Sequence, residues 1–140
     1  MEKKEVAIVF GITSNYVFAL ANVLIGMKNH CNKFWDDVIV FHDGISDNDK
    51  KNINKIVKCN FIDFPTQNFN PKINSKILSE YSLLSLARFE CFNLLHKYKK
   101  VIWQDVDILI QKDISSLLQY GEKGGFSATI TDANFLVESN

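Results

Sequence analysis

Two aspartates, Asp105 and Asp107, interrupt the apolar run "VIWQDVDILI" and are the residues of this sequence best suited to chemistry. In an extended segment residues i and i+2 point to the same side, so both carboxylates should converge while Val106 faces the fold. Two like charges held this close repel each other unless a cation or a shared proton joins them. Carboxylate oxygens suit Mg²⁺ or Mn²⁺, which take their remaining ligands from water and substrate phosphates. The pair therefore predicts a divalent-metal site for a diphosphate; the alternative is a turn cap beside a solvated acid.

A cationic residue upstream, Arg88, could supply a second part of the site. It falls on a stripe of helical spacing, which predicts that it packs toward the sheet. A buried guanidinium needs an anion, and Asp105, Asp107 or a bound phosphate are the candidates. The alternative is that Arg88 reaches solvent from the edge of the stripe. The stripe consists of Leu84, Arg88, Cys91, Phe92 and Leu95.

Short apolar runs alternate with helical segments along the chain, and turn or cap residues separate them. A polar stretch with two prolines, 65–76, is long enough to be a mobile loop near a site. The expected strands are 5–11, 36–44, 59–64, 99–105 and 124–130, and the expected helices are 15–30, 46–58, 79–98 and 113–121.

This alternation predicts an α/β fold with a mainly parallel sheet and right-handed crossovers. The strand runs are continuously apolar, as expected when helices cover both faces of the sheet. In a doubly wound sheet the first strand neighbours the fourth, and ligands bind beyond the carboxyl ends of the strands. The loops "GITSNY" and "QDVDIL" should then face one crevice.

The composition favours one cytoplasmic globular domain over residues 1–140. The chain is 46% hydrophobic, with 16 basic and 16 acidic residues, so a nucleic-acid partner would find no basic stripe. Apolar runs stay below the length of a transmembrane helix, and the start has no signal-peptide pattern. Three widely spaced cysteines without a C-x-x-C motif indicate reduced, mostly buried thiols.

With these motifs in view, the sequence resembles the family 8 glycosyltransferases. These are retaining, metal-dependent enzymes of the GT-A (Rossmann-like) fold that use nucleotide-sugar donors. Members include bacterial lipopolysaccharide galactosyl- and glucosyltransferases and glycogenin-type enzymes. The similar segments are "AIVFGITSNYVFALANVLIGM", "VIVFHDGISDNDKKNI" and, most specifically, "LARFECFNLLHKYKKVIWQDVDILIQKDISSLL".

The resemblance implies that Asp105 and Asp107 bind Mn²⁺ (or Mg²⁺) and, through it, the donor diphosphate. Arg88 matches an arginine near the donor sugar, and Asn15 and Tyr16 match a pair that contacts and stacks on uracil. Thr13 replaces an aspartate that reads the uracil edge, which allows a base other than uracil. The implied donor-binding residues are Gly11, Thr13, Asn15, Tyr16, Arg88, Asp105, Val106 and Asp107.

Three further acids lie near family positions. We interpret Asp113 as a helix N-cap before "ISSLL" and Asp43 as a turn residue. Asp132 lies about where the family has another donor-site acid, but the match is too weak to assign it.

Family enzymes continue well beyond position 140, with acceptor-site residues and a histidine that completes the metal shell. The resemblance therefore implies a GT-A domain truncated on its C-terminal side. Surface that a missing half would cover favours homo-oligomers or poor solubility.

Three hypotheses follow. The first is a retaining transferase that moves a hexose from a nucleotide-sugar, such as a UDP-hexose, to a glycan or lipid-linked saccharide in lipopolysaccharide or capsule synthesis. Such an enzyme would be cytoplasmic or peripheral at the inner face of the membrane. The second is a donor-binding fragment without transfer activity. The third is a phosphotransferase of the haloacid dehalogenase type, which wants a small hydroxyl residue where Leu109 stands.

Overall fold

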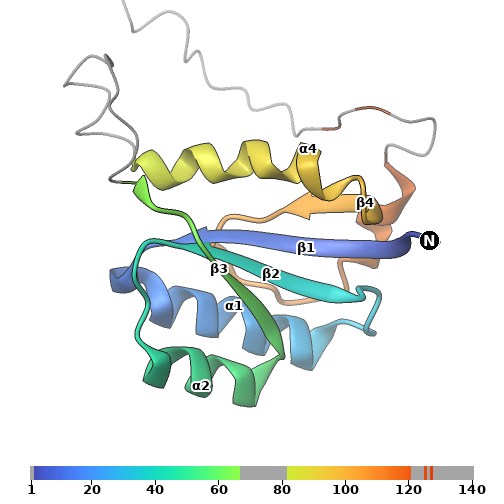
Figure 1. Ribbon diagram of the computed structural model, residues 1–140. Helices are drawn as coiled ribbons and strands as arrows, with labels where there is room; N and C mark the ends of the chain where they lie inside the picture. The colour runs from blue at the N-terminus through green and yellow to red at the C-terminus, as the bar shows by residue number, and fades with distance from the viewer. Residues whose placement is uncertain (1, 67–81, 121–124, 126, 128–140) are drawn as a thin grey trace, which may run out of the picture.

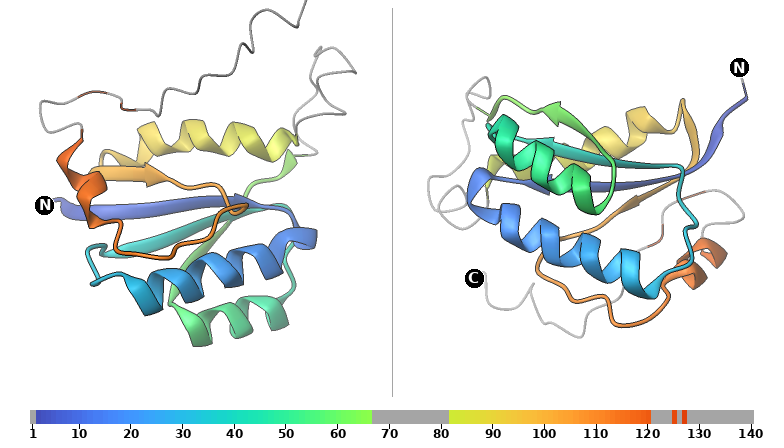
Figure 2. Two further views of the ribbon diagram at one scale, coloured as in Figure 1. Left: turned by 180° about the vertical axis from the view of Figure 1, so that it is seen from behind. Right: turned by 90° about the horizontal axis from the view of Figure 1, so that it is seen from below.

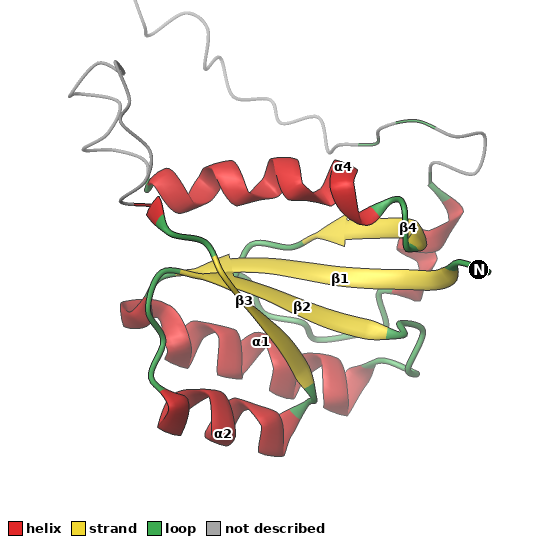
Figure 3. Ribbon diagram, viewed as in Figure 1, coloured by secondary structure: helices red, strands yellow, loops and turns green. Residues whose placement is uncertain are grey.

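The computed structural model describes residues 2–66, 82–120, 125 and 127. Within this part of the chain, four parallel strands form one sheet in the order β3-β2-β1-β4, with helices on both faces (Figures 1 and 3), so the predicted α/β class is confirmed. The strands are β1 (Lys4–Ile12), β2 (Asp37–His42), β3 (Cys59–Asp63) and β4 (Tyr98–Trp103). The helices, with η for 3₁₀, are η1 (Ser14–Tyr16), α1 (Val17–His30), α2 (Asp47–Ile56), η3 (Leu83–Phe89), α4 (Glu90–Leu94) and η4 (Ser115–Gln119).

The first strand lies between the second and the fourth, so its predicted place beside the fourth is confirmed. Ile12 is level with His42 at the end of β2, and Val9 is level with Trp103 at the end of β4. Because all these pairs are parallel, the carboxyl ends of the strands meet at one edge of the sheet. The segments that follow β1 and β4 therefore leave the sheet from neighbouring positions.

Alternate residues of β1 pack into two separate cores. Ile8 and Phe10 belong to the core under α1 and α2, whereas Ala7 and Val9 belong to the core under η3 and α4. Figure 2 shows the same two layers, with α1 and α2 on one face of the sheet and α4 on the other. All four side chains are at most 1% exposed, which explains the uninterrupted apolar run in the sequence.

Helix α1 also anchors the segment that follows the D-x-D pair. A Cβ atom added at Gly26 would lie 2.8 Å from the carbonyl oxygen of Ile110. Ile110 is 6% exposed and joins the core under α1. A glycine in α1 thus allows the chain to dock there, and this contact holds the middle of the 104–114 segment against the fold.

Helix α2 begins with a cap formed by Ser46 and Asp49. The Ser46 hydroxyl accepts a hydrogen bond from the backbone N–H of Asp49 (3.1 Å) and donates one to the Asp49 carboxylate (2.6 Å). This reciprocal pair satisfies a helix N–H that has no partner within the helix.

Several expected elements differ in the structure. The described part of the helix expected at 79–98 is a 3₁₀ helix followed by the short α4, and the helix expected at 113–121 is the 3₁₀ helix η4. Strand β4 ends at Trp103, so Asp105 and Asp107 lie beyond it and not on a strand. The loop expected at 65–76 and the fifth strand at 124–130 fall largely outside the described residues, and Asp132 lies outside them.

Candidate functional site

The two loops predicted to share an edge of the sheet do so. Gly11 and Ile12 end β1, and residues 104–107 continue β4, its parallel neighbour. Both acids of the D-x-D pair are exposed, whereas Val106 is half-buried against the core. Val106 faces the core as predicted, but the residues form a bend and not the extended strand from which the prediction was argued.

Trp103, which is not among the predicted site residues, connects the two loops. Its indole Nε1 donates a hydrogen bond of 2.9 Å to Oδ1 of Asp105. A Cβ atom at Gly11 would lie 2.6 Å from Cη2 of the same ring, closer than side-chain carbons approach. The Trp103 ring therefore occupies space that a side chain at position 11 would fill. A signal was present in the sequence, namely a tryptophan two residues before an aspartate at a strand end.

Arg88 is exposed, so the prediction that it packs toward the sheet is wrong and the alternative, that it reaches solvent, is correct. Its side chain is 51% exposed, while Leu84 and Ala87 are the buried residues of η3. The reason is the 3₁₀ winding, in which three residues complete a turn and positions 84 and 87 share a face. The predicted stripe assumed α-helical spacing, which would have placed position 88 beneath position 84.

The predicted anionic partner of Arg88 is nevertheless present. Its guanidinium Nη2 lies 3.8 Å from Oδ1 of Asp105, and its Cζ lies 5.5 Å from the centre of the Trp103 ring. Both charged side chains are more than half exposed, so solvent screens the ion pair and its contribution to stability is small. The arrangement places a cation on an aromatic face beside the carboxylate.

The donor set of the D-x-D pair fits a hard divalent cation. Both contacts that Asp105 makes with described side chains involve Oδ1, and no described residue donates to its Oδ2 or to either oxygen of Asp107. Among the described residues, no third His, Cys, Asp or Glu side chain completes a larger metal-binding cluster. Two carboxylates suit Mg²⁺ or Mn²⁺, which commonly bind through one or two acids, water and substrate phosphates.

The loop after β1 presents an exposed aromatic pair. The backbone N–H of Tyr16 donates to the carbonyl oxygen of Thr13 (3.0 Å), which closes the turn η1. The Tyr16 ring is 52% exposed and stacks on Phe18 with centroids 6.4 Å apart and planes 18° apart. Asn15 is also exposed. No hydrogen bond or ion pair joins these residues to Arg88 or the D-x-D acids in the described part of the chain.

A buried histidine, His42, ends β2 at the same edge of the sheet. Its Nδ1 accepts hydrogen bonds from the backbone N–H groups of Gly44 (3.3 Å) and Ile45 (3.4 Å). Nδ1 is therefore unprotonated, and its 3.3 Å contact with Asp63 is not an ion pair. Burial, followed by the positive charge of Lys50, lowers the pKa of His42. Because Nδ1 accepts, the ring is neutral and its N–H is on Nε2, which has no partner among the described residues.

Two acids interpreted as local structure have that role. Asp43 lies in the bend before Gly44, whose φ of +117° is a conformation that favours glycine. Asp113 accepts a hydrogen bond from the backbone N–H of Ser115 (2.9 Å) at the start of η4. The residue immediately before η4 is Ile114, so Asp113 caps the turn from one position further back.

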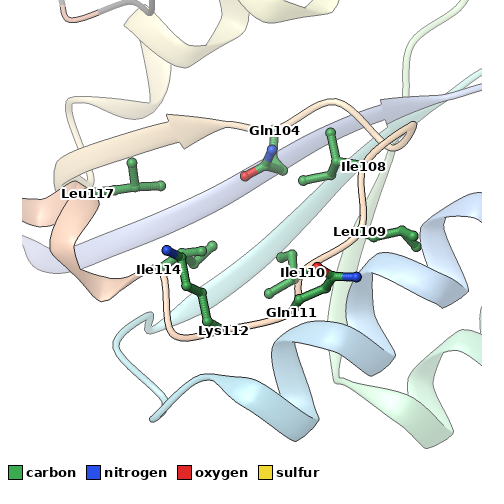
Figure 4. A pocket seen from close by; sticks show the side chains of 8 residues that line it. All are labelled: Gln104, Ile108, Leu109, Ile110, Gln111, Lys112, Ile114 and Leu117. Atoms are coloured by element: carbon green, nitrogen blue, oxygen red, sulfur yellow. The ribbon is translucent and has the colours of Figure 1, made fainter.

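A cavity of about 590 Å³ lies beside the D-x-D segment but does not contain the acids. Figure 4 shows side chains of the 104–117 segment around it, beside the strands and α1. Its lining is mostly apolar and includes neither Asp105 nor Asp107, so the candidate metal site is the exposed edge and not this cavity. The lining residues are Gln104, Ile108, Leu109, Ile110, Gln111, Lys112, Ile114 and Leu117.

The geometry agrees with a comparison of the sequence with known families, in which residues 7–140 match glycosyl transferase family 8. The chain belongs to this family. Membership agrees with the predicted resemblance and leaves the haloacid dehalogenase hypothesis without support. No curated protein sequence matches the chain.

Solved structures that share the fold of this family 8 chain include two glycosyltransferases. The crystal structure of the galactosyltransferase LgtC in complex with donor and acceptor sugar analogues has a TM-score of 0.62 and 20% identity, over 79% of this chain and 41% of LgtC. The apo structure of the bifunctional glycosyltransferase WbbM has a TM-score of 0.62 and 19% identity, over 85% of this chain and 21% of WbbM. The predicted GT-A fold is thereby confirmed, and the chain spans less than half the length of either protein.

Among the helices of the described residues, none is long and apolar enough to cross a lipid bilayer.

Proposed function

We propose that this chain is the nucleotide-sugar-binding domain, over residues 1–140, of a glycosyltransferase that transfers a hexose. The observation that carries the proposal is the Asp105 carboxylate beside Arg88 and Trp103, at the end of a strand next to β1, in a chain of glycosyl transferase family 8. Ligands of such parallel sheets bind beyond the carboxyl ends of the strands. The donor would therefore lie over the loops that follow β1 and β4.

Asp105 and Asp107 would hold Mn²⁺ or Mg²⁺. A bound cation would bind the donor diphosphate and stabilise the charge on it as it leaves. Arg88, which is exposed beside Asp105, would contact the donor sugar or its phosphates as a second positive charge. Val106 is half-buried, and its packing would fix the backbone between the two acids.

The loop after β1 would receive the base. Tyr16 presents an exposed ring, and Asn15 an exposed amide, at the end of the strand that neighbours β4. Aromatic stacking binds any base, so recognition of uracil in particular would depend on Thr13 and Asn15. Gly11 would contribute to the donor site indirectly, because its lack of a side chain leaves room for the Trp103 ring.

The reaction would retain the configuration of the sugar, and the acceptor would be a glycan or lipid-linked saccharide in lipopolysaccharide or capsule synthesis. An enzyme of this kind would work in the cytoplasm, either free or peripheral at the inner face of the membrane. The solved structure of LgtC holds donor and acceptor sugar analogues, which supports a nucleotide-sugar and a saccharide as the two partners here.

The test is a thermal-shift titration of the 140-residue chain with UDP and several UDP-hexoses, with and without Mn²⁺. A ligand at about 100 times its dissociation constant stabilises a fold by roughly 2.7 kcal/mol. We expect a shift that requires Mn²⁺ and that the Asp105→Asn/Asp107→Asn variant loses. Asp113→Asn is the matched control, because it removes a nearby charge while the amide oxygen can still accept from Ser115.

A shift equal in wild type and in the double variant would contradict the metal assignment. Replacing UDP with CDP and GDP tests the consequence of Thr13, because a larger shift with another base would reassign the donor. Release or transfer of radiolabelled hexose distinguishes a transferase from the alternative, a donor-binding fragment without activity.

A further inference from the structure

One side chain, Trp103, contacts three of the residues assigned to the donor site. It hydrogen-bonds Asp105, lies beneath the guanidinium of Arg88 and fills the space left by Gly11. These residues come from the end of β1, from η3 and from the segment after β4. The indole thus joins three elements that are distant in the sequence.

The hydrogen bond to Asp105 has a specific consequence for its carboxylate. Nη2 of Arg88 is 3.8 Å from Oδ1, too far for a hydrogen bond, so Nε1 of Trp103 is the hydrogen-bond donor to Asp105 in the described part of the chain. Both contacts are made to Oδ1, which leaves Oδ2 for another ligand. A carboxylate that is otherwise 62% exposed is in this way given one orientation.

We propose that Trp103 is a positioning residue that holds Asp105 so that its Oδ2 faces the divalent cation. This inference rests on the proposed function, because it assumes that Asp105 is a metal ligand. Groups that hydrogen-bond metal ligands fix their orientation, and their loss commonly weakens metal binding 10- to 100-fold. A role in packing alone would require the ring but not its N–H group.

Trp103→Phe tests the N–H group, because phenylalanine keeps an aromatic ring at position 103, although without the indole atoms nearest Gly11, and has no N–H donor. Mn²⁺ binding to the 140-residue chain is measured from the electron paramagnetic resonance signal of free Mn²⁺. We expect Trp103→Phe to weaken Mn²⁺ binding roughly 10-fold or more. Trp35→Phe is the matched control, because Trp35 packs on Phe34 and lies just before β2, at the amino edge of the sheet.

A second readout keeps Trp103 in place and does not depend on the fold of a Trp103 variant. The chain has two tryptophans, so Trp103 is the one fluorescent indole left in Trp35→Phe. Because its N–H is bonded to Asp105, Mn²⁺ binding should change its emission. Asp105→Asn in the same background should abolish that change.

The outcomes are distinct. The positioning role is overturned if a folded Trp103→Phe variant binds Mn²⁺ with unchanged affinity. It is also overturned if the emission of Trp103 does not change when Mn²⁺ binds. In both cases the metal site itself is not contradicted. Wild-type chain that binds no Mn²⁺, or binds it equally after Asp105→Asn/Asp107→Asn, overturns the metal site of the proposed function and this inference with it. Weakened binding in Trp103→Phe together with an Asp105-dependent change in emission supports it.

Discussion

Replacing Gly11 with alanine should force Trp103 out of its place. The added Cβ would lie 2.6 Å from Cη2 and 3.1 Å from Cζ2 of the indole, so the ring has to move. If the Trp103 ring moves, its hydrogen bond to Asp105 and its contact with the Arg88 guanidinium are strained or broken. Overpacking costs about 1–3 kcal/mol in a well-packed core. Because Trp103 is only half-buried, we expect a loss of about 1–2 kcal/mol in the free energy of unfolding, the lower part of that range.

Urea unfolding of four proteins measures this effect: wild type, Gly11→Ala, Trp103→Phe and the double variant. Phenylalanine lacks the atoms that the new Cβ would strike, so the double variant should be more stable than the sum of the two single losses predicts, by about 1–2 kcal/mol. Gly26→Ala is the matched control. Its Cβ would strike the Ile110 backbone, so its loss should be the same with Trp103 or phenylalanine at position 103.

Additive losses for Gly11→Ala and Trp103→Phe would refute the reasoning. They would mean that the indole has room to move or that the two residues do not touch. A Gly11→Ala chain as stable as wild type would refute it as well, because no close contact would then exist.

Three other perturbations have outcomes that the structure predicts. As the pH falls below 6.5, the unfolded chain protonates His42 before the folded chain does, because its folded pKa is lowered. The free energy of unfolding should therefore be highest above pH 6.5 and decline below it, and His42→Leu should decline less in urea titrations between pH 7.5 and 5.5. Burial raises the pKa of Cys59 to about 12 and that of Cys91 to about 11. At pH 8 roughly 10⁻⁴ and 10⁻³ of these thiols are ionised, so mass spectrometry should find both unlabelled by iodoacetamide until urea unfolds the chain. Ser46→Ala removes the cap of α2 and should cost about 1 kcal/mol in urea unfolding, whereas equal stability would show that this cap is dispensable.

Local sequence was sufficient to predict the sheet. A run such as "VAIVF" has no polar residue because both faces of β1 are covered, and the segments between the runs are too long for hairpins. Parallel strands joined by helices then bring their carboxyl ends to one edge. For this reason the adjacency of the loops after β1 and β4 could be predicted from the order of the elements along the chain.

The helix before β4 shows where local pattern failed. The spacing of Leu84 and Arg88 is that of an α-helix, yet residues 83–89 wind as a 3₁₀ helix and bury Ala87. The energies that separate the two windings are small, and packing on the sheet decides between them. Arg88 consequently lies outside the core, although its anionic partner Asp105 was among the predicted candidates.

The sequence by itself determined the class of fold, the exposed D-x-D pair and the family, because these depend on residue type and short spacing. Only the tertiary structure decided that Gly11, Trp103, Arg88 and Asp105 form one connected group. Gly11 and Trp103 are separated by most of the chain and meet because β1 and β4 pair in one register. That register is set by the packing of both sheet faces at once, and no local segment of the sequence carries it.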